Sequence, residues 1–110
     1  MAHDEKLAER IRRCLSDRKD IVERKMFGGI AFMVRGNMCC GVVGEELMVR
    51  VGPKGYEGAL REKYTREMDF TGRPLRGMVY VAAPGYTSAN QLGYWVERGL
   101  QFVLTLPEKK

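Results

Sequence analysis

The sequence predicts a single α+β domain in which an antiparallel sheet of about five strands is covered by helices mainly on one face. Three observations lead to this prediction. The chain has 110 residues, of which 45% are hydrophobic, so one domain with one core is expected over residues 1–110. Helical periodicity occurs near both ends and once between them, and short apolar runs separated by glycine fill the intervals. The predicted order is α-β-β-β-α-β-β-α, which favours a two-layer sandwich over a doubly wound parallel sheet.

The first predicted element is an amphipathic helix over residues 4–16. Asp4 is a suitable N-cap, because its carboxylate can accept hydrogen bonds from the first free backbone N–H groups. The apolar stripe of this helix consists of Leu7, Ala8, Ile11, Cys14 and Leu15. The charged residues 17–20 contain nothing to bury and are expected to form a connector.

Short apolar runs predict an antiparallel meander in the next part of the chain. Its three strands are expected at residues 30–35, 38–43 and 47–51. Gly36-Asn37 is suited to a two-residue hairpin link, since glycine tolerates the positive φ that a type II′ turn requires at its first central position. Residues 44–46 form the second turn, and residues 22–26 are a candidate for an additional edge pairing.

The second half of the chain predicts a helix, a hairpin and a final helix. Gly52-Pro53 is expected to end the third strand and to open a helix that carries Tyr56, Ala59, Leu60, Lys63 and Tyr64 on one face. Residues 67–70 and 77–82 predict a second hairpin. Ser88 and Gln91 have the spacing of a capping box. The last helix follows, with its stripe at Leu92, Trp95, Val96, Gly99, Leu100, Val103 and Leu104, and Pro107 is expected to stop it. Gly99 on this stripe indicates a close approach to the sheet.

Several short motifs in this order resemble the TfoX/Sxy N-terminal domain family. They are Lys25-Met26-Phe27-Gly28-Gly29 after the first helix, the later strand Leu47-Met48-Val49-Arg50-Val51, and Trp95-Val96 in the last helix. The resemblance implies helices packed on an antiparallel sheet, in regulators of bacterial DNA-uptake competence and in free-standing proteins, and it brings no catalytic residues. The full-length regulators continue into a second, helical domain, whereas this sequence ends at Lys110. We therefore expect the fold to carry over better than the role in competence.

The residue inventory does not favour catalysis, and we expect a protein that is not an enzyme. His3 is the only histidine available as a base, and it lies next to a terminus that is expected to fray. Cys39 and Cys40 are adjacent and lack the spacing with which two thiolates bind one zinc ion. We expect them to point to opposite faces of their strand, with a redox role as the alternative, and Cys14 to belong to the buried helix stripe. No catalytic residue, metal site, cofactor or small-molecule ligand is indicated.

Glycine and hydropathy patterns also bear on ligands and location. Gly28-Gly29 is not followed by the Gly-Lys-Ser/Thr ending of a phosphate-binding loop, so a bend or bulge is the favoured interpretation. The sequence has neither a signal segment nor an apolar run near 18 residues. We expect a cytoplasmic protein without a membrane partner.

Strand alternation indicates a binding surface for a protein partner or a second copy of the chain. If the helices cover one face of the sheet, the other face is expected to expose methionines with arginines at its margin. Methionine adapts to varied partners, and arginine supplies directional hydrogen bonds at a rim. The predicted partner surface consists of Met33, Arg35, Met48 and Arg50. Methionines that merely fill gaps in the core are the simpler alternative.

Direct nucleic-acid binding is the competing hypothesis. The formal net charge is +5 and the predicted pI is about 9.3. The candidate contacts lie within one stretch and are Arg61, Lys63, Arg66, Arg73 and Arg76. The same stretch carries Glu62, Glu67 and Asp69, which would offset much of the positive field.

Overall fold

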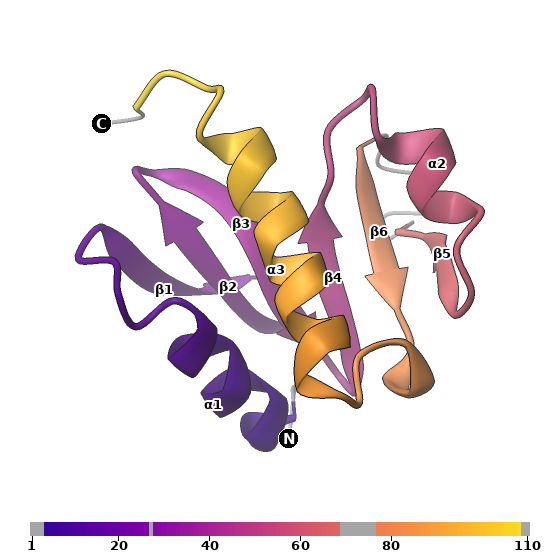
Figure 1. Ribbon diagram of the computed structural model, residues 1–110. Helices are drawn as coiled ribbons and strands as arrows, with labels where there is room; N and C mark the ends of the chain where they lie inside the picture. Colours follow the sequence, from indigo (N-terminus) through magenta and orange to yellow (C-terminus); the bar gives the residue numbers. More distant parts are fainter. Residues whose placement is uncertain (1–3, 27, 69–76, 109–110) are drawn as a thin grey trace.

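The computed structural model describes residues 4–26, 28–68 and 77–108 of the chain (Figure 1). The elements in order are α1 (Glu5–Cys14), β1 (Ile21–Met26), β2 (Gly29–Val34), β3 (Asn37–Val43), β4 (Glu46–Arg50), α2 (Tyr56–Leu60), β5 (Thr65–Glu67), β6 (Met78–Val81), the 3₁₀ turn η1 (Ala83–Gly85) and α3 (Ala89–Val103). These elements confirm the predicted α+β class, with helices packed on an antiparallel sheet.

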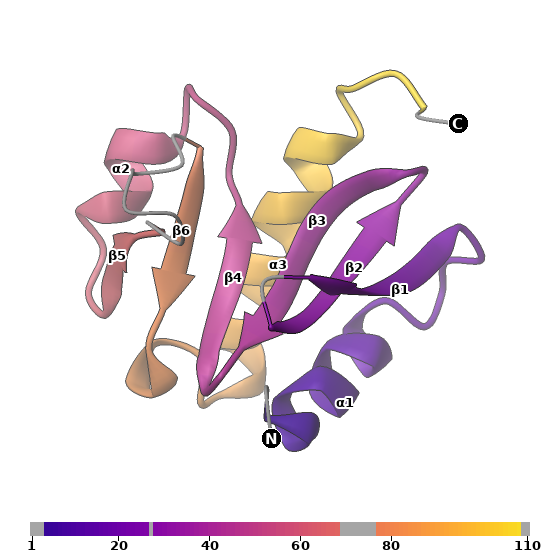
Figure 2. The ribbon, with the colours of Figure 1, turned by 180° about the vertical axis from the view of Figure 1, so that it is seen from behind.

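A single antiparallel sheet with the strand order β1-β2-β3-β4-β6-β5 organises the domain. Residues from all three α-helices share one core with the sheet, and α3 lies across β3 and β4 (Figure 1). Seen from behind, the other face of the sheet has no helix of the described residues over it (Figure 2). We call these the helix-covered face and the methionine face. The second name refers to its buried cluster, which comprises Ala31, Met33, Met48, Met68, Met78 and Tyr80.

The sheet has six strands rather than about five, because the segment expected to add only an edge pairing is a complete strand. β1 pairs antiparallel with β2 over six residues, from Ile21 opposite Val34 to Met26 opposite Gly29. Four of its six residues are exposed, so it lacks the alternation of a half-buried strand. Pairing with β2, rather than burial, fixes this strand.

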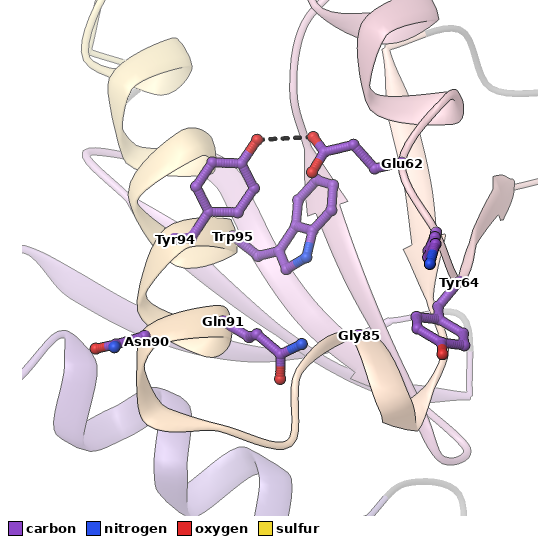
Figure 3. Close-up of a pocket in the computed structure, with 8 residues that line it drawn as sticks. Glu62, Tyr64, Gly85, Asn90, Gln91, Tyr94 and Trp95 are labelled. Carbon is purple, nitrogen blue, oxygen red and sulfur yellow. Dashed lines mark hydrogen bonds between the residues drawn. The ribbon is translucent and has the colours of Figure 1, made fainter.

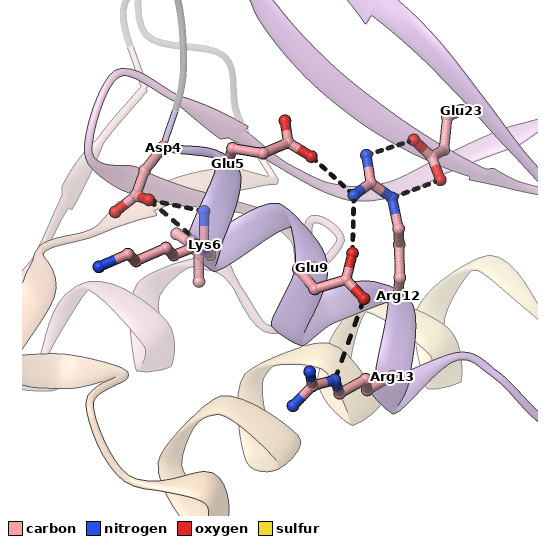
Figure 4. Close-up of polar contacts among 8 residues, drawn as sticks. Asp4, Glu5, Lys6, Glu9, Arg12, Arg13 and Glu23 are labelled. Carbon is pink, nitrogen blue, oxygen red and sulfur yellow. Dashed lines mark hydrogen bonds and ion pairs between the residues drawn. The ribbon is translucent and has the colours of Figure 1, made fainter.

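α1 begins as predicted, because the Asp4 side chain accepts hydrogen bonds from the backbone N–H groups of Lys6 and Leu7. Arg12 ties the helix to the sheet through a bidentate pair with Glu23 of β1, at 2.8 and 2.9 Å (Figure 4). The assignment of Cys14 to the buried stripe was wrong, since this residue is exposed. The helix ends there, and Leu15 fills the core position instead.

The first hairpin turn is built differently from the expected one. Val34 pairs with Asn37, so Arg35 and Gly36 are the two central residues. Their φ angles are 53° and 81°. Positive φ at both central positions is the signature of a type I′ turn, which matches the twist of the flanking strands. The turn therefore lies one residue earlier than predicted, and Asn37 is the first residue of β3.

A β-bulge overturns the expectation that the adjacent cysteines face opposite sides of their strand. Phe32 pairs with Cys40 and Met33 pairs with Met38, which leaves Cys39 as an extra residue in β3. Cys39 and Cys40 are both fully buried, and both belong to the core under the helices. The pKa of the Cys40 thiol is raised by a hydrogen bond with Cys39 and by complete burial. The cysteine side chain is small, so a cysteine fits at each of the two buried positions of the bulge.

This arrangement predicts the thiol chemistry of the native protein. Of the three cysteines, Cys14 alone is exposed, and partial burial of its sulfur raises its pKa. We expect a thiol-reactive reagent to modify one thiol per chain, slowly, under native conditions and all three after denaturation. Mass spectrometry of the labelled peptides locates the modification. Native labelling of Cys39 or Cys40 at the rate of Cys14 would contradict the buried bulge.

The second half of the chain follows the prediction with two shifts. α2 has its N-cap at Gly55, so Pro53 precedes the helix instead of opening it. α2 ends at Leu60, and the later positions expected on its face leave the helix. The predicted strand at residues 67–70 lies earlier, as β5, and its last two residues are outside the described part of the chain.

The last helix has the predicted capping box. The Ser88 hydroxyl accepts from the Gln91 N–H, and the Gln91 side chain accepts from the Ser88 N–H, both at 3.0 Å. Close approach of this helix to the sheet is confirmed at Gly99. An added Cβ at this residue would lie 2.8 Å from the carbonyl oxygen of Cys39.

Candidate binding groove

The predicted partner surface is not an exposed patch. Met48 is completely buried and Met33 is only 9% exposed, so the expectation that both lie open on the helix-free face was wrong. The physical reason is that long methionine side chains cover one another on the sheet. Met48 extends over Gly41 on the neighbouring strand, where an added Cβ would lie 2.7 Å from its terminal methyl carbon. Met68, which follows β5, is also completely buried in this cluster.

The two arginines of that predicted surface lie at strand ends, and no methionine among the described residues is exposed beside them. Arg35 occupies the turn between β2 and β3 and is partly exposed. The guanidinium carbon of Arg50 lies 5.3 Å from the ring centroid of Phe102 in α3, a distance typical of a cation–π contact. The four residues therefore do not form one joint surface for a partner.

The structure also separates the candidate nucleic-acid contacts that it describes. Arg66 pairs with Glu46, and its guanidinium carbon lies 4.5 Å from the ring centroid of Tyr80 on the methionine face. Arg61 and Lys63 are exposed, and Lys63 lines a hollow beside α3. Arg73 and Arg76 lie outside the described residues. Within the described chain, these cations form no continuous basic track.

The glycine motif has a structural explanation. Gly28 adopts a φ of 76°, and a Cβ added at Gly29 would overlap the Val42 carbonyl oxygen. Met26 packs against the methionine cluster, and Phe27 lies outside the described residues. The positive φ of Gly28 agrees with the bend interpretation, whereas Gly29 is required by the close approach of β3.

The hollow beside α3 is a groove of about 380 Å³ between this helix and the chain that links α2 to β5 (Figure 3). Its volume lies within the range of small binding sites. The residues that line it are Glu62, Lys63, Tyr64, Gly85, Asn90, Gln91, Tyr94 and Trp95. We refer to it as the tyrosine groove, because Tyr64 and Tyr94 are among its exposed side chains.

The α3 wall of the groove combines a buried ring with an exposed one. Trp95 is only 3% exposed and anchors the helix in the core, whereas Tyr94 is 46% exposed. Their ring centroids are 5.1 Å apart with an interplanar angle of 68°, an edge-to-face contact. The guanidinium carbon of Arg98 lies 5.8 Å from the Tyr94 ring and 5.4 Å from the Trp95 ring. The orientation of the exposed tyrosine is thus fixed by its neighbours.

The opposite wall holds Tyr64 in an unusual backbone conformation. Its φ is 69°, in the left-handed region that bulky residues rarely adopt. The Tyr64 carbonyl accepts a hydrogen bond of 2.8 Å from the Ala82 N–H, and Thr65 donates to the carbonyls of Ala59 and Glu62. Gly85 lies close by, so that an added Cβ would be 3.2 Å from the Tyr64 Cβ. This strained turn holds Tyr64 at 51% exposure, and such strain is often found at functional sites.

Glu62 links the two walls. Its Oε2 accepts a hydrogen bond of 2.7 Å from the Tyr94 hydroxyl (Figure 3) and another of 2.7 Å from Arg98. Arg98 also donates to the Gly55 carbonyl, which connects the network to the start of α2. Partial burial, and then the hydrogen bond to Glu62, raise the pKa of the Tyr94 phenol. The Tyr94 phenol is therefore protonated at neutral pH, and the Glu62 carboxylate holds the two walls of the groove together.

The sequence indicated only part of this site. Trp95 was assigned to the apolar stripe of the last helix, and Tyr64 to the face of a helix that ends before it. Tyr94 was missed, although a large aromatic residue off the apolar stripe of an amphipathic helix is a usable signal. Nothing in the sequence indicated that these segments, about thirty residues apart, form two walls of one groove.

The described residues contain neither a cluster of metal ligands nor a membrane-spanning helix. In the ranges 4–26, 28–68 and 77–108, no group of three or more His, Cys, Asp or Glu residues is placed to hold a metal ion. No helix in these ranges has both the length and the apolar character needed to cross a membrane.

Comparison with known proteins identifies one family. The family model of the TfoX N-terminal domain matches residues 13–103, which include every strand, α2 and α3. Searches of the curated proteins and of the solved structures found no match.

Proposed function

The chain belongs to the TfoX N-terminal domain family, and we propose from this premise that it is a non-catalytic module that binds a partner protein through the tyrosine groove. The observation that carries the proposal is the pair of tyrosines, each about half exposed, in a groove whose walls are fixed by hydrogen bonds. Tyrosine is enriched in protein interfaces because a rigid ring gives a large contact area at a small loss of entropy.

The chemistry of the groove favours an extended peptide segment as its occupant. Tyrosine rings beside a buried tryptophan are suited to pack against proline or aliphatic side chains. Gln91, at the start of α3, closes one end of the groove, where its amide accepts from the Ser88 N–H and donates to the Pro84 carbonyl. We expect the partner to insert a proline or aliphatic residue between Tyr64 and Tyr94.

The charges at the groove argue for this occupant over a nucleic acid. Lys63 is the exposed cation of the lining, and the Glu62 carboxylate lies beside it, whereas Arg98 is already bound to that carboxylate. Single-stranded nucleic acids combine base stacking with several phosphate contacts. The tyrosines supply stacking surfaces, but the lining supplies few cations.

We also propose that the protein has no catalytic activity and that it is cytoplasmic. The carboxylate in the groove is held by an arginine and a tyrosine hydroxyl, which leaves it poorly suited to accept a proton from a substrate. All three cysteines are free thiols, which suits a reducing compartment.

Affinity capture with matched variants tests the proposal. The groove variant carries Tyr64→Ala and Tyr94→Ala. The control carries Leu104→Ala, which removes a side chain that is 41% exposed just after α3 and away from the groove. We expect wild type and control to retain the same protein after nuclease treatment, and the groove variant to bind it at least about tenfold more weakly.

The other outcomes are equally informative. Equal retention of the partner by all three proteins would place the interface outside the groove and overturn the proposal. If nucleic acid dominates the recovered material and the bound proteins disappear with nuclease, direct nucleic-acid binding replaces it. Steep loss of that binding between low and physiological salt would then identify phosphate contacts.

A further inference from the structure

The open edge of β1 carries a second interaction surface, distant in sequence from the tyrosine groove. β1 is an end strand of the sheet, and no other strand of the described residues pairs with its outer side. It is six residues long, whereas the other end strand, β5, has three. A long edge strand presents unpaired N–H and C=O groups that a further strand can bind. Val22 lies in this edge strand and is 56% exposed, more than the other exposed large hydrophobic residues of the described chain.

The register of β1 against β2 shows which backbone groups face outward. The Arg35 N–H donates to the Asp20 carbonyl, so residues 20 and 35 form a hydrogen-bonded pair. Such pairs alternate along an antiparallel ladder. Val22, Arg24 and Met26 therefore direct their backbone groups to β2. Residues 21, 23 and 25 direct theirs to the open edge.

A second copy of the chain can form hydrogen bonds with the outward-facing backbone groups of β1 in a favourable register. In an antiparallel pair about a two-fold axis, one residue lies opposite its own copy. Centring the axis on Glu23, Arg24 or Lys25 would place like charges directly opposite each other, which is destabilising. Centring it on Val22 places valine against valine. It also brings Asp20, whose carboxylate Arg18 holds at 2.7 Å, opposite Arg24 twice, whereas Lys19, which would face Lys25, precedes the strand.

The backbone geometry agrees with the same register. With Val22 on the axis, Ile21 lies opposite Glu23 on both sides. These are the residues whose N–H and C=O groups point outward, so they form hydrogen-bonded pairs. Val22 then falls at a non-hydrogen-bonded position, where opposing Cα atoms are about 4.5 Å apart and side chains meet most closely.

The apolar surface is continuous across the axis as well. Val22 pairs with Met33 of β2, so it lies on the methionine face. Two Val22 side chains that meet at the axis would join the methionine clusters of the two copies, and each Val22 side chain would become buried. Glu23 lies on the other face, where Arg12 already holds its carboxylate (Figure 4).

From these observations we infer that the domain forms a two-fold dimer by antiparallel pairing of β1 with β1 of a second copy, centred on Val22. The alternative explanation is that the charged residues of β1 prevent this edge from pairing, which is the common role of charges on edge strands, and that the domain is a monomer. The two explanations predict different masses in solution.

The test measures the mass of the intact chain by light scattering and follows the fold by circular dichroism. We expect twice the chain mass of 12.5 kDa for the wild type and the single-chain mass for Val22→Glu and for Val22→Lys. Both variants should keep the wild-type spectrum, because the substituted side chain is exposed. Mixing them places opposite charges at the axis and should restore the dimer. Leu104→Glu, the matched control at another exposed hydrophobic residue, should remain dimeric.

Cross-linking tests the register. In a Cys14→Ser background, Val22→Cys should form a disulfide-linked dimer on oxidation, because the expected Cα separation suits a disulfide. Arg24→Cys, on the same face two residues away, should cross-link much less. A monomeric wild type, or a dimer that persists in Val22→Glu, would overturn the inference. Cross-linking through residue 24 alone would overturn the register. The groove variants should leave the mass unchanged, so the two proposals fail independently.

Discussion

Replacing Met48 with glutamate should unfold the domain or come close to it. The side chain is completely buried in the methionine cluster, so the variant loses its packing and places a carboxylate among apolar groups. We expect the free energy of unfolding to fall by more than about 4 kcal/mol, a large part of the 5–15 kcal/mol typical of a whole domain. Urea denaturation followed by circular dichroism measures the change.

Leucine at the same position is the matched control. It has a similar volume and no charge, so Met48→Leu should reduce the free energy of unfolding by less than about 1.5 kcal/mol. If the glutamate variant were as stable as wild type, the side chain would have to reach solvent. That result would restore the exposed partner surface that strand alternation predicted.

Alanine at Gly99 should destabilise the domain by about 2 kcal/mol, although alanine is the better helix former. An added Cβ would lie 2.8 Å from the Cys39 carbonyl oxygen and 3.0 Å from its sulfur. Both atoms belong to the bulge in β3, where backbone pairing restricts movement. α3 would have to lift from the sheet to make room.

Gly93→Ala is the same substitution in the same helix without the obstruction. Nothing lies within 4 Å of an added Cβ at this residue. We expect the gain in helix propensity to raise the free energy of unfolding by about 1 kcal/mol. Urea denaturation of both variants compares them directly. Changes of the same sign and size would show that the close approach at Gly99 has no energetic weight.

Local patterns in the sequence were sufficient for most of the fold. The Asp4 cap, the Ser88 capping box and the stripe centred on Trp95 depend on residues within a few positions of one another. The three strands of the meander were recognisable because each contains a short apolar run. β1 was harder to recognise, because its exposed residues show no alternation.

Errors arose where a local pattern depended on a distant partner. Alternation along β2 and β4 correctly placed Met33 and Met48 on the face without helices. It could not show that methionines from four segments would cover each other there. The expectation that Cys39 and Cys40 diverge failed for a related reason. The bulge that turns both inward exists only in the pairing of β3 with β2.

The two proposed binding surfaces show most clearly which features the sequence alone determined and which depended on the tertiary structure. Local sequence patterns alone determined the α+β class, the helix caps and the position of Gly99 on the apolar stripe of the last helix, because each follows from neighbours along the chain. Tertiary structure decided that Tyr64 and Tyr94 line one groove, since Glu62 reaches α3 only after the chain has folded. It also decided that β1 is an end strand with Val22 exposed, because strand order depends on which segments pair. Burial and pairing are properties of the whole chain, and no single segment encodes them.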